Sequence, residues 1–129
     1  MQFFYNWDDL EAEDHGLPDS LCKIKAITGD KLQLIRARFE PGGEYETHSH
    51  PHEQFSLMVA GRMLLRVGDQ QREVGPGDIW YAPPGVVHGG TLLGDEPVIF
   101  IDMFHPVREE VLEEMRRKRA ERLGPEGAQ

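Results

Sequence analysis

The sequence predicts an all-β domain followed by one C-terminal helix, and two features of the chain support this. Its 129 residues include 14 glycines and 9 prolines, which are scattered along the chain rather than gathered in one segment. Turn residues that recur between short apolar runs favour a sandwich or barrel of many strands. The length fits one domain with a single hydrophobic core.

Three segments follow from the pattern. Residues 1–20 form a polar lead-in, residues 21–106 the barrel, and residues 107–123 a helix packed on or beside it. Glycine and proline turns such as Gly29-Asp30 and Pro41-Gly42-Gly43 separate the expected strands. These strands are residues 22–28, 31–40, 45–50, 54–60, 62–67, 71–74, 79–82, 86–93 and 97–105.

The C-terminal segment changes to a helical period. Apolar residues recur at the spacing of one helix face, and glutamates precede arginines, which suits the helix dipole. Pro106 fits the first turn of this helix, and Gly124-Pro125 is expected to end it. The apolar residues of this face are Val107, Val111, Leu112 and Met115.

Composition excludes several classes of function. A formal net charge of −9 argues against binding to nucleic acid or to an anionic membrane. No apolar run approaches the roughly 20 residues that span a bilayer. The first 14 residues lack the pattern of a signal peptide, and the single cysteine, Cys22, cannot form an intrachain disulfide. A cytoplasmic location is the default expectation.

Three histidines carry the strongest chemical signal. His48 and His50 are two residues apart, so on a strand both imidazoles lie on one face. His88 follows a turn stiffened by Pro83-Pro84 on a separate strand. Three imidazoles and a side-chain oxygen suit Zn, Fe, Ni, Mn or Co and leave positions open for a substrate. His52, Glu53 and Gln54 are candidates for the oxygen or a further donor.

The glycine, histidine and proline spacing resembles the two motifs of the cupin superfamily. The first motif is matched by Gly42, His48, His50, Gln54 in the usual glutamate place, and Gly61. The second is matched by Gly77, Pro83, Gly85 and His88, with Leu92 where asparagine is usual. The resemblance implies a double-stranded β-helix, or jelly-roll barrel. It also implies one divalent metal ion bound by His48, His50, Gln54 and His88.

Gln54 departs from the usual glutamate of the motif. An amide oxygen leaves the metal with more of its positive charge than a carboxylate would, which favours Lewis-acid chemistry on an anionic substrate. His52 or Glu53 could ligate instead, although Gln54 fits the motif spacing better.

The last strand places an acid in an apolar run. Val98, Phe100, Asp102 and Phe104 share one face, and the other face is also largely apolar, so we expect burial on both sides. Burial of the Asp102 carboxylate is costly unless the group has an ion-pair or hydrogen-bond partner, or unless it has a functional role. It either has a functional role or forms a salt bridge, for which the candidates are Arg36, Arg38 and Arg108.

The segment from His48 to Gln54, with Asp102, Phe104 and Arg108 downstream, resembles the pectin-degradation cupins of the KdgF type. Those proteins open 4,5-unsaturated uronates to linear keto sugar acids. The resemblance implies that Asp102, Phe104 and Arg108 line the substrate pocket. From the chemistry of these side chains, we expect Asp102 to move protons, Arg108 to clamp the substrate carboxylate and Phe104 to pack on the sugar. The resemblance also implies a homodimer.

Two other functions compete with this interpretation. One is a metal-dependent dioxygenase, which would consume oxygen. The other is a non-catalytic barrel that binds a sugar or another small molecule.

Overall fold

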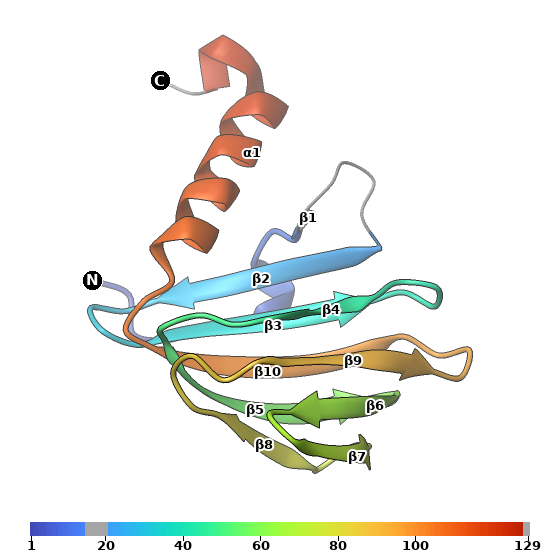
Figure 1. The fold of residues 1–129 in the computed structure, drawn as a ribbon. Coiled ribbons are helices and arrows are strands. Elements are labelled where there is room, and N and C mark those ends of the chain that lie inside the picture. The colour runs from blue at the N-terminus through green and yellow to red at the C-terminus, as the bar shows by residue number, and fades with distance from the viewer. Residues whose placement is uncertain (15–20, 128–129) are drawn as a thin grey trace.

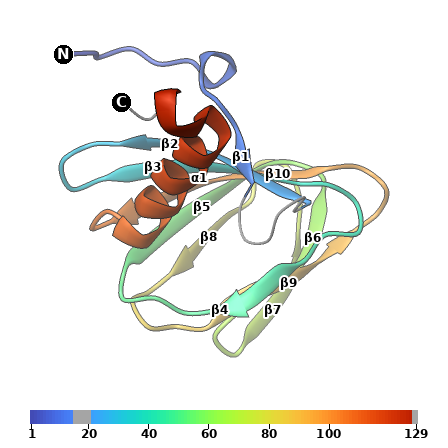
Figure 2. The same ribbon diagram turned by 90° about the horizontal axis from the view of Figure 1, so that it is seen from above.

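The architecture is two facing antiparallel sheets with one helix leading away from them (Figures 1 and 2). A computed structural model of the chain describes residues 1–14 and 21–127. The six-stranded sheet has the order β1-β2-β3-β10-β5-β8, and the four-stranded sheet has the order β4-β9-β6-β7. The all-β jelly-roll barrel with a C-terminal helix that the sequence predicts is therefore confirmed.

The strands follow the predicted pattern, with differences of a few residues at their ends. Their bounds are β1 Glu13–Asp14, β2 Cys22–Thr28, β3 Gln33–Phe39, β4 Tyr45–His48, β5 Glu53–Ala60, β6 Arg62–Val67, β7 Gln70–Val74, β8 Ile79–Ala82, β9 His88–Leu93 and β10 Val98–His105. The short strand β1 lies in the lead-in, where the sequence shows no strand pattern, and it pairs with β2.

The core lies between the two sheets and is rich in aromatic rings. Phe100 of β10 stacks on Phe39 with ring centroids 5.6 Å apart, and the rings of Tyr45 and Trp80 lie 5.1 and 5.3 Å from it. Met58 and Met63 approach this cluster from opposite sheets and are at most 1% exposed. Strand alternation sends every second side chain into this layer, and this inward face also carries the polar residues described below.

Along its second half, the last strand is buried on its inner face and exposed on its outer face. The expectation of burial on both sides is therefore wrong for this half. β10 is central in its sheet, paired with β3 on one side and with β5 on the other. Asp102 and Phe104 point inward and are buried, whereas Met103 is 44% exposed on the outer face. An apolar side chain on a central strand is buried only where another layer covers it.

The helix α1, Glu109–Gly127, packs its first turns against the barrel. Val111 is buried and Met115 contacts the core, and Arg122 forms an ion pair of 2.6 Å with Glu11 of the lead-in. The helix continues past Pro125, so the expected end at Gly124-Pro125 is wrong. A proline in the last turn costs a single backbone hydrogen bond, which the chain tolerates there. Among the described residues, no helix has the length and apolar character needed to cross a bilayer.

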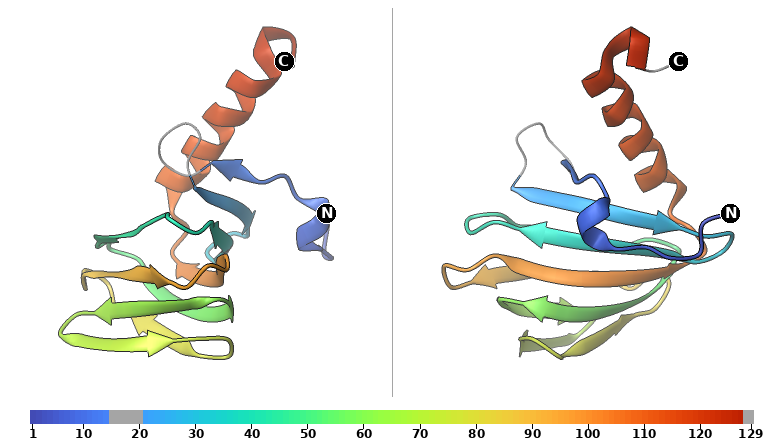
Figure 3. Two further views of the ribbon diagram at one scale, coloured as in Figure 1. Left: turned by 90° about the vertical axis from the view of Figure 1, so that its right-hand side faces the viewer. Right: turned by 180° about the vertical axis from the view of Figure 1, so that it is seen from behind.

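The lead-in contains a 3₁₀ helix, Trp7–Asp9, beside the outer face of β2 and β3 (Figure 3). Lys25 of β2 donates from Nζ to the Trp7 carbonyl oxygen at 2.8 Å. One flank of the six-stranded sheet is therefore partly covered by the chain itself.

Gly61 in the turn between β5 and β6 provides a test of the fold. Its φ is 79°, and a Cβ there would lie 2.5 Å from the Pro97 carbonyl oxygen. We expect Gly61→Ala to lower the free energy of unfolding by about 3–4 kcal/mol in urea denaturation. Gly77, with φ 92° and open space around it, is the matched control, because its alanine variant incurs only the conformational cost of about 1–2 kcal/mol. Equal losses in the two variants would contradict the close approach at Gly61.

Candidate metal centre and substrate site

Three imidazoles converge at one end of the barrel. His48 ends β4 and His88 begins β9, and the antiparallel register places them directly opposite each other. His50 lies two residues beyond His48, in the connection to β5. One ring nitrogen from each histidine lies within 4.8 Å of the others. The three histidines that the sequence predicts to act together are thus brought together, and they could hold a metal ion.

Backbone carbonyl groups orient all three rings. The Nδ1 atoms of His48, His50 and His88 lie 2.7, 3.2 and 2.9 Å from the carbonyl oxygens of Glu46, His52 and Val86. A carbonyl oxygen can only accept a hydrogen bond, so each Nδ1 carries the proton and each Nε2 carries a lone pair. The Nε2 atom of His88 is buried and has no hydrogen-bond partner, as expected of a nitrogen that binds a cation.

Gln54 of β5 directs its amide oxygen at the same point. Its Oε1 lies 2.9 Å from the Nε2 of His50, and its Nε2 donates to Ser56 Oγ at 2.9 Å and to Asp102 Oδ1 at 3.2 Å. With the Nδ1 of His50 protonated, two lone pairs face each other across the 2.9 Å contact. Two ligand atoms about 2.1 Å from a shared ion, at a right angle, are about 3.0 Å apart. The residues present therefore fit a metal ion.

Burial keeps two of the imidazoles neutral. The pKa of His88 is lowered to about 4, mainly by desolvation and also by the neighbouring His48, His50 and Arg108, against the opposing effect of the Val86 hydrogen bond. Desolvation also lowers the pKa of His50, and the Arg108 guanidinium adds to this effect. Neutral imidazoles are the form that binds metal, so the site is ready for a cation at neutral pH.

Asp102 is a buried carboxyl group beside this centre. It is 7% exposed and accepts hydrogen bonds at Oδ1 from Ser56 Oγ, at 2.5 Å, and from Gln54. Desolvation raises its pKa to about 7, although Ser56, Arg108 and Gln54 oppose the rise. The hydrogen bonds described for Asp102 thus go to the neutral side chains of Ser56 and Gln54 rather than to Arg36, Arg38 or Arg108. The sequence pattern could have indicated Ser56, because Gln54 lies two residues before Ser56 and strand alternation puts both side chains on the same face.

Arg108 lies over the ring of Phe104, with Cζ 5.1 Å from the ring centroid. Its backbone N–H donates to the buried amide oxygen of Gln33 at 3.1 Å, and its Nε donates to Glu110 at 2.7 Å. Glu110 occupies Nε only, so the two terminal nitrogens can pair with a carboxylate. Gln33, which the sequence pattern did not single out, therefore fixes the start of this segment.

Phe104 connects the arginine to the metal centre. Its ring packs edge-on against His50, with centroids 5.5 Å apart, and His52 lies 6.5 Å away on the same ring. Glu53 instead points outward and accepts a hydrogen bond of 2.5 Å from the Tyr81 hydroxyl. The positions therefore favour Gln54 over Glu53 as the oxygen donor near the three histidines.

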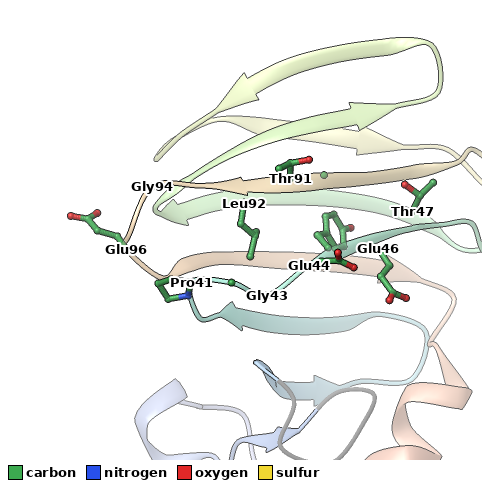
Figure 4. A pocket seen from close by; sticks show the side chains of 12 residues that line it. Pro41, Gly43, Glu44, Glu46, Thr47, Thr91, Leu92, Gly94 and Glu96 are labelled. Atoms are coloured by element: carbon green, nitrogen blue, oxygen red, sulfur yellow. The ribbon is translucent and has the colours of Figure 1, made fainter.

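A hollow lies beside β4 and β9 (Figure 4), and Tyr45, which lines it, also contacts His48 with ring centroids 5.4 Å apart. Its cavity volume is about 500 Å³, and its lining includes the carboxylates of Glu44, Glu46 and Glu96. None of the three histidines lines it, and its acidic border disfavours an anionic ligand.

Comparison with known proteins agrees with this geometry. The oxalate decarboxylase OxdC of Bacillus subtilis is 30% identical over 68% of the chain, which spans 24% of that protein's length. The pectin degradation protein KdgF of Dickeya dadantii is 29% identical over 87% of the chain and over its own full length.

Solved structures share the fold over most of the chain. A cupin described as RmlC-like from Shewanella frigidimarina superposes with a TM-score of 0.76 at 28% identity, covering 86% of this chain and 96% of its own. KdgF from Halomonas sp. superposes with a TM-score of 0.75 at 26% identity, covering 85% of this chain and 99% of its own. Residues 35–104 match the family model described as a cupin domain. The chain therefore belongs to the cupin family.

Proposed function

We propose that this cupin is a metal-dependent enzyme of sugar-acid catabolism, which opens 4,5-unsaturated uronates to their linear keto forms. The observation that carries the proposal is the grouping of three imidazoles, a buried carboxyl group and an arginine at one end of the barrel. Similarity to KdgF, a pectin degradation protein, over the full length of that protein supports this substrate class. The cytoplasmic location stays a prediction.

One divalent metal ion, one of Zn, Ni, Fe, Mn or Co, would be bound by the Nε2 atoms of His48, His50 and His88 and by Oε1 of Gln54. Such an ion acts as a Lewis acid that polarises substrate oxygens. All four proposed ligands are neutral, so the full charge of the ion stays available to attract an anion.

Asp102 is the proposed proton-transfer group. In an unsaturated uronate, the ring oxygen is attached to the alkene and the carboxylate is on the same carbon. Opening breaks the bond between the anomeric carbon and the ring oxygen while the anomeric hydroxyl loses its proton and becomes an aldehyde. The alkene carbon gains a proton, and the former ring oxygen becomes a ketone. The carboxyl group of Asp102, on the inward face of β10 beside Gln54, would carry this proton.

Arg108 and Phe104 are the proposed substrate-binding residues. The planar guanidinium offers its terminal N–H groups to the two oxygens of a carboxylate. Glu110 and the Phe104 ring restrict its orientation, so less conformational freedom is lost when the substrate binds. Phe104 offers an apolar surface to the sugar between the arginine and His50.

Metal analysis tests the ligand set. Purified protein should contain about one divalent ion per chain by inductively coupled plasma mass spectrometry. We expect His88→Ala to lose the ion, and Gln54→Ala to bind it about 10–100-fold more weakly in a chelator competition. His105→Ala is the control, because His105 lies exposed on the outer face of β10. Unchanged affinity in Gln54→Ala would remove Gln54 from the set.

Loss of ultraviolet absorbance from unsaturated galacturonate tests the reaction. We expect Asp102→Asn to keep its metal ion and to lose about 10²–10⁴-fold in kcat, because the amide cannot carry the proton. Glu53→Gln, on the exposed face of β5, should react at the normal rate. Full turnover by Asp102→Asn would exclude Asp102 from the mechanism. Oxygen consumption in an oxygen electrode would favour a dioxygenase, and tight binding without conversion would favour a sugar-binding barrel.

Arg108→Lys tests carboxylate recognition. A lysine keeps the charge but loses the two-pronged contact, so we expect KM to rise about 10–100-fold while metal content stays constant. Glu110→Gln is the control, since it keeps the guanidinium and alters only its Nε contact. An unchanged KM in Arg108→Lys would show that the carboxylate binds elsewhere.

A further inference from the structure

His52 is a buried imidazole that the proposed mechanism does not use. It lies between the proposed ligands His50 and Gln54 in the sequence and is 9% exposed. Its Nδ1 atom is buried and has no hydrogen-bond partner among the described residues. Buried polar side chains are normally hydrogen-bonded, because their transfer out of water otherwise costs free energy. A histidine at this position therefore needs an explanation beyond packing.

The ring of His52 lies beside both the metal centre and the proposed substrate-binding residues. Its centroid is 5.3 Å from that of His50, and it packs edge-on against Phe104 with centroids 6.5 Å apart. The register pairs Gln54 with Phe104, and His52 directly precedes β5, so the backbone fixes this arrangement. Arg108 lies over the same Phe104 ring. A substrate that packs on Phe104 would therefore have His52 and Arg108 beside it.

His52 also interacts with Glu110, the ion-pair partner of Arg108. Desolvation raises the pKa of Glu110, whereas Arg108 and, by a smaller effect, His52 lower it, and the pKa ends below its ordinary value. Such an electrostatic effect requires the imidazole and the carboxylate to be near each other, because it falls with distance. His52 and the proposed carboxylate-binding arginine thus belong to one group of side chains.

The surroundings of the His52 ring indicate which of its nitrogens carries the proton. A neutral imidazole has one N–H donor and one lone pair. A proton on Nδ1 would be a buried donor without an acceptor, which is rarer and costlier than a buried lone pair without a donor. The proton of the neutral ring is therefore assigned to Nε2, on the opposite side of the ring, where it can be donated to a ligand.

We propose that His52 is a further substrate-binding residue, whose Nε2–H donates a hydrogen bond to the carboxylate of a sugar acid bound at Arg108. This inference rests on the proposed function, since it assumes a uronate site at Arg108 and Phe104. The two oxygens of a carboxylate offer about four lone-pair sites, so they can accept from the guanidinium fork and from an imidazole together. The additional donor favours a sugar acid over a neutral sugar, because the neutral sugar leaves both groups without an acceptor.

Three substitutions of His52 separate a hydrogen bond from ring packing. His52→Phe keeps an aromatic ring beside Phe104 and removes both nitrogens. His52→Gln places an amide nitrogen close to the position of Nε2, whereas His52→Asn places it close to that of Nδ1. We expect the KM for unsaturated galacturonate to rise about 10–100-fold in His52→Phe and His52→Asn, with kcat changed less than about threefold. His52→Gln should restore the KM to within about threefold of the wild type.

A role in packing alone predicts the opposite order, with His52→Phe normal and His52→Gln impaired. His105→Phe, on the exposed outer face of β10, is the matched control and should leave the KM unchanged. Metal content and thermal melting show that each variant is loaded and folded. If His52→Phe does not fold, His52→Asn takes its place in the comparison.

Binding of saturated galacturonate measures the contact apart from the reaction, because this sugar acid has no alkene to protonate. Calorimetric titration should show an affinity about 10–100-fold lower in His52→Phe than in the wild type. Galactose, which lacks the carboxylate, should bind equally weakly to both.

The possible results distinguish the role of His52 from the proposed reaction. Unchanged KM and affinity in metal-loaded His52→Phe would overturn the role of His52 and leave the reaction intact. Loss of the metal ion from this variant, or no restoration of the KM by His52→Gln, would also overturn it. If the wild type binds galacturonate but does not convert the unsaturated sugar, the reaction is wrong, and the binding series still decides the role of His52. A wild type that binds no uronate contradicts both proposals.

Discussion

The pairing of β10 with strands on both of its sides is the constraint on which the rest of the molecule depends. Because β3 and β5 fix its register, the alternation of its side chains is fixed too. Asp102 and Phe104 face the interior, whereas Ile101 and Met103 face outward. A shift by one residue would exchange the two faces and destroy the site and the core together. The function proposed here is therefore tied to the register of one central strand.

The interior beside this strand contains polar side chains that form hydrogen bonds with one another. Gln54, Ser56 and Asp102 are each at most 7% exposed and form a connected set of hydrogen bonds. A buried polar group without a partner would cost about 1–3 kcal/mol, so this network holds each member in one orientation. Its effect on the metal centre is direct, since the amide nitrogen of Gln54 is occupied and its oxygen must face His50.

The candidate centre carries little of the negative charge of the chain. The formal net charge is −9, yet neutral imidazoles, an amide oxygen and the Arg108 guanidinium surround the candidate centre. Local charges act over a few ångströms in a partly buried site, where they outweigh the screened field of distant carboxylates. An acidic protein can thus present a site suited to an anionic substrate. The hollow near β4 is instead bordered by carboxylates, which disfavour an anionic ligand.

Most of the strands and the candidate ligands could be predicted from the order of residues along the chain. Period-two alternation and glycine turns depend on neighbouring residues alone, so strands such as β2 and β6 follow from the chain. The histidine spacing of two residues sets a shared face, and the motif comparison added Gln54 and His88.

Contacts between groups that lie far apart along the chain could not be predicted in this way, because they depend on the folded arrangement. Ser56 and Gln33 gained their roles from partners 46 and 75 residues away along the chain. The strand β1 forms because β2 offers it an edge, and Met103 is exposed because no described element covers that face. Such contacts depend on register and on layer packing between remote segments, and local sequence pattern carries no information about either.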